Sequence, residues 1–128
     1  MISHISLIHV KIKNPNMNLL REAVKNLAME IGAELVNEVV DYYGRKVKVD
    51  LGVKNDVFHR GVGITVQNGE VKLIGDFYGY RQHVEQLQLG LVKHYTALAT
   101  AVTLRNMGYQ VQSSKVKNSI FIRAISYG

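Results

Sequence analysis

The sequence of 128 residues contains no cysteine. Disulfide bonds, thiolate nucleophiles and zinc sites ligated by cysteine are therefore excluded. The sequence also lacks an apolar run near the roughly 20 residues that span a bilayer, and its amino terminus has no hydrophobic signal region. These absences predict a soluble protein of the cytoplasm that does not enter the membrane.

Several catalytic and cofactor-binding motifs are missing as well. There is no Gly-x-Ser-x-Gly nucleophile elbow, and Gly61-Val62-Gly63 is not followed by the helix and lysine of a phosphate-binding loop. The histidines are too far apart for a local metal site, since His83 and His94 would lie roughly 16 Å apart along one helix. We therefore expect no metal and no cofactor, and a non-catalytic role is favoured over an enzyme.

What the sequence does contain is an ordinary globular composition. Hydrophobic residues make up 47% and charged residues 20%, so the chain can bury a core and is not disordered. Its length fits a single domain that spans residues 1–128. The formal net charge of +6 leans toward an acidic partner.

Two stretches have the apolar spacing of amphipathic helices. The longer one, around which the rest of the chain is arranged, follows residues 76–81 and ends before Gly108, with apolar side chains at steps of three and four. These side chains are Val84, Leu87, Leu91, Tyr95, Leu98 and Val102. The shorter helix spans about Met17–Ile31, with Asn16 as its amino-terminal cap and Gly32 as its stop.

Short runs of alternating or β-branched residues predict strands around these helices. They span Ser3–Lys13, Leu35–Val40, Lys46–Val53, Val57–Gln67, Val71–Leu73 and a last hairpin made of Tyr109–Ser113 and Ile120–Ile125. Asn68-Gly69 predicts a two-residue turn in which both positions need positive φ. The sequence therefore predicts an α+β fold, with an antiparallel-rich sheet and both helices on one face.

The order of these elements repeats once along the chain. Strand, helix, glycine, strand, basic turn and strand describe residues 3–53, and the same order describes residues 71–126. The segment Ile31–Val36 aligns with Met107–Gln112. One hypothesis is that two βαββ units share one sheet. The alternative is that a common short motif occurs twice.

Several short strings resemble one protein family. They are Ser3-His4-Ile5-Ser6, Lys11-Ile12-Lys13, Gly61-Val62-Gly63, Phe77-Tyr78-Gly79, His94-Tyr95 and Gly108-Tyr109. The family is a conserved open reading frame of cyanobacteria and red-algal plastids, with relatives in other prokaryotes. The chain departs from it in having Ile2 before the Ser-His pair and in lacking tryptophan. The resemblance implies a single α+β domain and brings no activity with it.

The residues at the start of the longer helix are the best local candidates for binding a ligand. They are Tyr78, Tyr80, Arg81 and His83. Free backbone amides and the helix dipole favour an anion at this place. The tyrosines can stack on a ring, and Arg81 can bind a carboxylate or phosphate through two nitrogens. The alternatives are that these aromatic side chains close the end of the core, or that an enzyme uses the region Asp76–His83.

The face of the sheet away from the helices is the second candidate site. Strand parity places basic and apolar side chains there together. The candidate interface or nucleic-acid residues are Lys11, Lys13, Lys46, Lys48 and Phe121, and we expect His9, Lys72, Arg123, Leu7, Ile74 and Ile125 beside them. Phe121 is the expected anchor of an interface, whereas its neighbours Ile120 and Ile122 are expected to face the helices.

A function follows from this mixed face. Large apolar patches are rarely left in water, and a symmetric homodimer is the commonest way to cover one. The sequence therefore favours a non-catalytic binding or assembly module that self-associates, with another protein as a second kind of partner. The first alternative is nucleic-acid binding by the basic face, and the last is a solvated surface rich in lysine.

Overall fold

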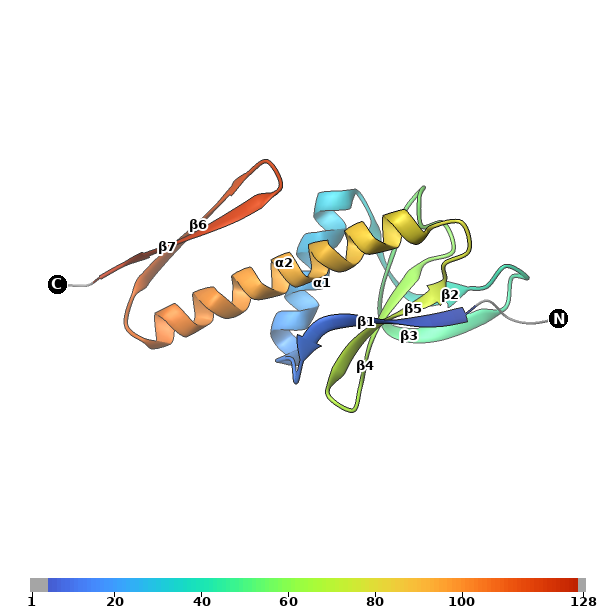
Figure 1. Cartoon of the computed structure of the whole chain (residues 1–128), viewed down its shortest axis with the longest axis horizontal. Helices are drawn as coiled ribbons and strands as arrows, with labels where there is room; N and C mark the ends of the chain where they lie inside the picture. Colours follow the sequence, from blue (N-terminus) through green and yellow to red (C-terminus); the bar gives the residue numbers. More distant parts are fainter. Residues whose placement is uncertain (1–4, 127–128) are drawn as a thin grey trace.

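A computed structural model describes residues 5–126, which form two helices and seven strands (Figure 1). In chain order these are β1 (Ile5–Lys13), α1 (Met17–Ile31), β2 (Glu34–Val40), β3 (Lys46–Lys54), β4 (Val62–Gln67), β5 (Glu70–Asp76), α2 (Arg81–Asn106), β6 (Gln110–Val116) and β7 (Ser119–Ile125). Ser3 and His4 of the family-like opening lie outside the described residues.

The first five strands form one antiparallel sheet in the order β1-β5-β4-β3-β2. The α+β fold with two helices on one sheet is therefore confirmed. Within residues 5–126, β6 and β7 form a second sheet of their own. The two βαββ units exist in chain order, but the hypothesis that they share one sheet is wrong, because only β5 of the second unit joins the first.

The length of α2 explains why the last hairpin stays apart. The helix has 26 residues, which rise roughly 39 Å. Figure 1 shows that its carboxyl-terminal half runs beyond the five-stranded sheet and carries β6 and β7 with it. Gly108 then turns the chain with a φ of +93°. We call residues 110–125 the arm.

Both ends of α1 are as the sequence predicts. The Asn16 side-chain oxygen accepts hydrogen bonds from the backbone N–H groups of Asn18 and Leu19, at 3.0 and 3.2 Å. These two groups have no partner within the helix, so the cap stabilises its first turn. At the other end, Gly32 adopts a φ of +65° and ends the helix.

The core lies between the two helices and one face of the five-stranded sheet. Ile8, Leu73, Ile64 and Leu51 are register neighbours on four adjacent strands, and all belong to the core. Five of the six residues of the predicted α2 stripe, all except Val102, belong to the same core. Val84, Leu87 and Leu91 are buried, and Tyr95, Leu98 and Val102 are partly buried.

β4 begins at Val62, later than the predicted start at Val57. The preceding segment is a loop whose start is held by the Asn55 side chain. Its oxygen accepts a hydrogen bond from the Phe58 N–H at 2.8 Å, and its nitrogen donates to the last carbonyl of α1 at 3.2 Å. Gly61 then takes a φ of +81°, which an extended strand does not allow. The apolar residues of this loop give it the sequence pattern of a strand.

β3 contains a bulge that turns one valine to the opposite face. The register between β2 and β3 shifts between Val36 and Glu38. The alternation of residues 46–53 predicts that Val47, Val49, Leu51 and Val53 share one face of this strand, and for Val49 this prediction is wrong because of the bulge. The Val49 Cγ1 atom lies only 2.6 Å from the position of a Cβ added to Gly63, and that position is on the face away from the helices.

Candidate functional site

An apolar row crosses the face of the five-stranded sheet that is turned away from the helices, which we call the outer face. Leu7, Ile74, Gly63, Gly52 and Val36 are register neighbours, one from each strand. On β1, β5, β4 and β3 the residue of this row stands next in sequence to a core-facing residue, namely Ile8, Leu73, Ile64 and Leu51. Because successive side chains along a strand point to opposite faces, the row lies on the outer face.

The glycines in the middle of this row make room for Val49. Gly52 and Gly63 are paired with each other. A Cβ on Gly63 would lie 2.6 Å from Val49 Cγ1 and 2.7 Å from Ile74 Cγ2, too close for either to stay in place. The centre of the outer face is therefore formed by Val49 and Ile74 packed on glycine backbone. At the β1 end of the row, Leu7 is 44% exposed.

Charges of both signs surround the row. His9 lies 3.2 Å from Glu70, and Lys46 lies 3.7 Å from Glu38. A hollow of about 700 Å³ over Val49 and Ile74 is lined by Lys48 and by Asp50. The outer face is mixed in charge, whereas a nucleic-acid surface is predominantly positive.

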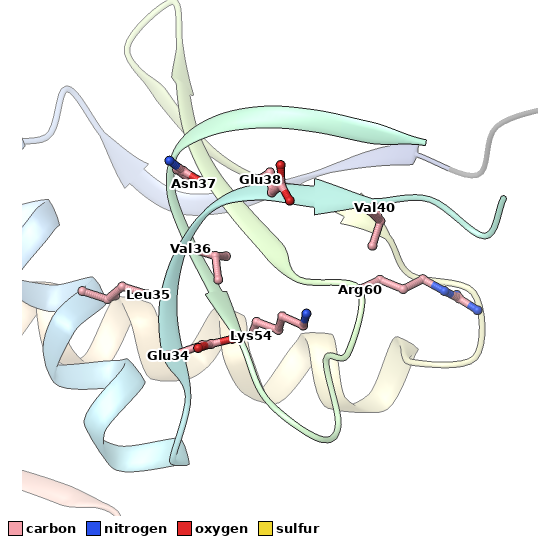
Figure 2. A pocket seen from close by; sticks show the side chains of 8 residues that line it. All are labelled: Glu34, Leu35, Val36, Asn37, Glu38, Val40, Lys54 and Arg60. Atoms are coloured by element: carbon pink, nitrogen blue, oxygen red, sulfur yellow. The ribbon is translucent and has the colours of Figure 1, made fainter. Parts of the chain in front are cut away.

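A second hollow, of about 610 Å³, lies at the β2 edge of the sheet (Figure 2). Figure 2 shows Val36 and Val40 pointing from β2 toward the side on which Lys54 lies. Glu34 is the register partner of Lys54. Apolar and oppositely charged side chains thus continue to the edge of the outer face.

The structure separates the residues that were predicted to share the outer face. Lys46 and Lys48 are on β3. Lys11 and Lys13 instead line a groove of about 450 Å³ together with residues of α2, because the register of β1 shifts before Lys13. The prediction that Phe121 lies on the outer face, with Arg123 and Ile125 beside it, is wrong, since β7 is not part of that sheet. Phe121 is 56% exposed on the arm.

At the start of α2, three of the four candidate ligand-binding residues come together. Tyr78, Arg81 and His83 line a depression of about 870 Å³ beside β1. Tyr78 is 69% exposed, and the side chain of Tyr80, at the N-cap position, makes no capping hydrogen bond. The buried Phe77 is the aromatic residue that closes the core here.

Tyr80 belongs to a different cluster, which the sequence reasoning missed. The Arg60 guanidinium lies between two tyrosine rings, 5.2 Å from the centroid of Tyr42 and 5.6 Å from that of Tyr80. The buried Asp76 is its counter-charge, with Oδ1 at 3.8 Å from Arg60 Nη1. Asp76 also accepts hydrogen bonds from the N–H groups of Tyr42 at 2.7 Å and Tyr78 at 3.2 Å. One sequence signal was available: an acidic residue at the end of an apolar strand.

Asp41 fixes the turn between β2 and β3. Its Oδ2 accepts a hydrogen bond from Arg45 Nε at 2.7 Å, and its Oδ1 accepts from the N–H groups of Tyr43 and Arg45, each at 2.9 Å. Burial raises the pKa of Asp41, but these hydrogen bonds outweigh burial and lower the pKa below its ordinary value. Asp41 and Asp76 both accept hydrogen bonds from backbone N–H groups and lie beside an arginine, so their contacts join the turn after β2 to the end of β5.

Glu30 connects the two helices and the arm. Its carboxylate lies 3.0 Å from Lys93 Nζ, 3.3 Å from His94 Nε2 and 2.5 Å from Lys115 Nζ. Burial raises the pKa of Glu30, yet hydrogen bonds from Lys115 and Lys93 outweigh it and lower the pKa to about 2. Burial lowers the pKa of His94. The helical pattern of α1 predicts only that Glu30 lies on its polar side, because Lys115 is too distant along the chain to be recognised as its partner.

Neither described helix has the length and apolar character needed to cross a membrane. Within residues 5–126, no three His, Asp or Glu side chains are grouped as a metal site would require. Comparisons with protein-family models, with curated proteins and with solved structures gave no match. The resemblance to the family of cyanobacteria and red-algal plastids therefore stays a prediction.

Proposed function

We propose that the protein is a non-catalytic assembly module of the cytoplasm, which self-associates through the outer face of its five-stranded sheet. One observation carries the proposal: the apolar row from Leu7 to Val36, with Val49 packed on Gly52 and Gly63 at its centre. Both helices pack on the opposite face. Apolar faces of this kind are commonly buried by a second subunit.

The charges around the row suit a second copy of the same chain. A two-fold axis brings one surface onto itself, so a surface that carries both signs can pair its own cations with its own anions. Lys48 and Asp50 line the same hollow of this face. A nucleic acid would instead meet Glu38, Asp50 and Glu70 here, so nucleic-acid binding by the outer face is the weaker alternative.

Lysine substitutions in the row test the proposal. Leu7→Lys places a charge at the β1 end of the interface and Ile74→Lys places one near its centre, and we expect multi-angle light scattering to show half the wild-type mass for each. Leu7 is largely exposed in the single chain, so its variant keeps the fold, which circular dichroism checks. Phe121→Lys makes the same change of charge on the arm and should leave the mass unchanged. A Leu7→Lys protein with the mass of a dimer contradicts the proposal.

A further inference from the structure

The positive charge of the protein is concentrated at its carboxyl-terminal end. Residues 86–128 contain five of the 16 Lys and Arg residues and none of the 10 acidic ones. Residues 1–85 contain the other 11 basic residues and all 10 acidic ones, so their net charge is +1, against +5 for the rest. Glu85, near the start of α2, is the last acidic residue of the chain.

Lys115, Lys117 and Arg123 of these five residues are on the arm, and Arg105 is in the last turn of α2. Lys93 and Lys115 are paired with Glu30, so Arg105, Lys117 and Arg123 carry the charge that remains available. α2 carries the arm beyond the five strands (Figure 1). On the inner face of the arm Ile120 and Ile122 are half-buried, as their predicted orientation toward the helices requires, and Lys115 is anchored on Glu30. The arm therefore has an inner face held against the helices and an opposite face, with Gln112, Ser114, Phe121 and Arg123, which we call the free face.

The free face of the arm presents polar and basic side chains in register, together with the exposed Phe121 and Val116. Gln112 is paired with Arg123 and Ser114 with Phe121, and all four are exposed. Lys117 forms the tip with a φ of +54°, and Arg105 is exposed in the last turn of α2. A two-stranded antiparallel ribbon with arginine and glutamine on one face has the chemistry that reads base edges.

We propose that the arm binds duplex DNA, with its free face in the major groove and with Lys117 and Arg105 on the flanking phosphates. The major groove of B-form DNA is roughly 12 Å wide and admits a two-stranded ribbon, whereas the major groove of an RNA duplex is too narrow. Proteins that bind single strands use several aromatic side chains as stacking platforms. The free face offers Phe121 alone among the described residues of the arm, which favours the duplex.

Fluorescence anisotropy with a labelled 20-base-pair DNA duplex tests the proposal. The variant carries Lys117→Asn and Arg123→Gln, where asparagine tolerates the positive φ of the tip. We expect the wild-type chain to bind at low salt and the variant to bind at least tenfold more weakly. The slope of log affinity against log salt should also fall by about 1, because the phosphate contact of Lys117 is lost, whereas Arg123 lies in the groove.

The matched control carries Arg21→Gln and Lys25→Gln, which remove the same charge from exposed positions of α1, and its affinity should stay within about twofold of wild type. Equal losses in the two double variants would mean that net charge alone matters and would overturn the proposal. Absence of binding, tighter binding to single-stranded DNA or to an RNA duplex, and equal competition by polyglutamate would each overturn it too. Should the first variant unfold, Ser114→Glu applies the same test through repulsion on the free face.

Discussion

Asp76 has no exposed side-chain surface, yet its carboxylate is held by two backbone N–H groups and by Arg60. Removing it leaves the N–H groups of Tyr42 and Tyr78 without an acceptor and a largely buried guanidinium without a counter-charge. We expect Asp76→Ala to lower the free energy of unfolding by about 3–5 kcal/mol in urea denaturation. Asp50→Ala, at an exposed position, should change it by less than about 0.5 kcal/mol. Equal effects would show that the contacts of Asp76 do not stabilise the fold.

The lowered pKa of Glu30 predicts how the free energy of unfolding changes in acid. Its pKa in the folded chain is about 2, below the ordinary value of 4.5. The ionised Glu30 carboxylate therefore stabilises the folded chain in full above pH 4.5, and this contribution is lost as the pH falls toward 2. His94 also makes the folded chain less stable as the pH falls. Its pKa is lowered from 6.5 in the folded chain, so the unfolded chain takes up the proton first.

Urea denaturation between pH 2 and pH 5 measures this effect. The wild-type chain should lose stability as the pH falls, and Glu30→Gln should be less stable at pH 5 and show a smaller change with pH. After allowance for solvent screening, the contribution of Glu30 should be about 1–2 kcal/mol. The same pH dependence in both proteins would exclude Glu30 as its source.

Gly69 adopts a φ of +76° in the turn between β4 and β5, as its sequence signal predicts. A Cβ added there would collide with Asn14 Oδ1. Gly69→Val should therefore cost more than the about 1–3 kcal/mol of backbone strain alone. Gly44→Val is the matched control, since Gly44 has a φ of +80° and open space around it. A smaller thermal destabilisation for Gly69→Val than for Gly44→Val would contradict the contact with Asn14.

Among the elements, α2 has a buried and an exposed side in its first half. Leu91 is fully buried, whereas Leu89 is 64% exposed. Leu91→Ala should cost about 2–5 kcal/mol through lost burial and a cavity, and Leu89→Ala should cost less than about 0.5 kcal/mol. Chemical denaturation of the two variants decides whether the stripe of α2 has been assigned to the correct face.

The elements that the sequence predicted well are those that local chemistry determines. Asn16 and Gly32 set the ends of α1, and the turn at Asn68-Gly69 is a two-residue signal. The predicted start of β4 was wrong because a side-chain contact from Asn55 holds the preceding segment as a loop. The predicted orientation of Val49 was wrong because a bulge in β3 determines it. Neither leaves a mark in the local hydrophobic pattern.

The same distinction applies to the candidate sites. Tyr78, Arg81 and His83 are neighbours in sequence, so their common depression could be predicted. The contact of Tyr80 with Arg60 joins separate loops and depends on how the chain folds back. Phe121 was misplaced because the hairpin pattern of β6 and β7 does not tell which sheet, if any, the hairpin joins.

At the scale of the whole molecule, two surfaces lie on different parts of the chain. The outer face belongs to the five-stranded sheet, and the arm folds back from the carboxyl-terminal end of α2, with Lys115 in contact with Glu30 of α1 (Figure 1). A dimer formed through the outer faces would leave both arms free. Two arms that reach one duplex raise the apparent affinity through their effective concentration, so Leu7→Lys should also weaken DNA binding by the wild-type arm.

Self-association is the central claim, and sedimentation equilibrium over a wide range of concentrations tests it most directly. A single chain has a mass of 14.4 kDa. We predict that the wild-type mass rises with concentration to twice that of a single chain, whereas the Leu7→Lys mass stays at that of one chain. A wild-type protein that remains at 14.4 kDa at the highest concentration would contradict the account.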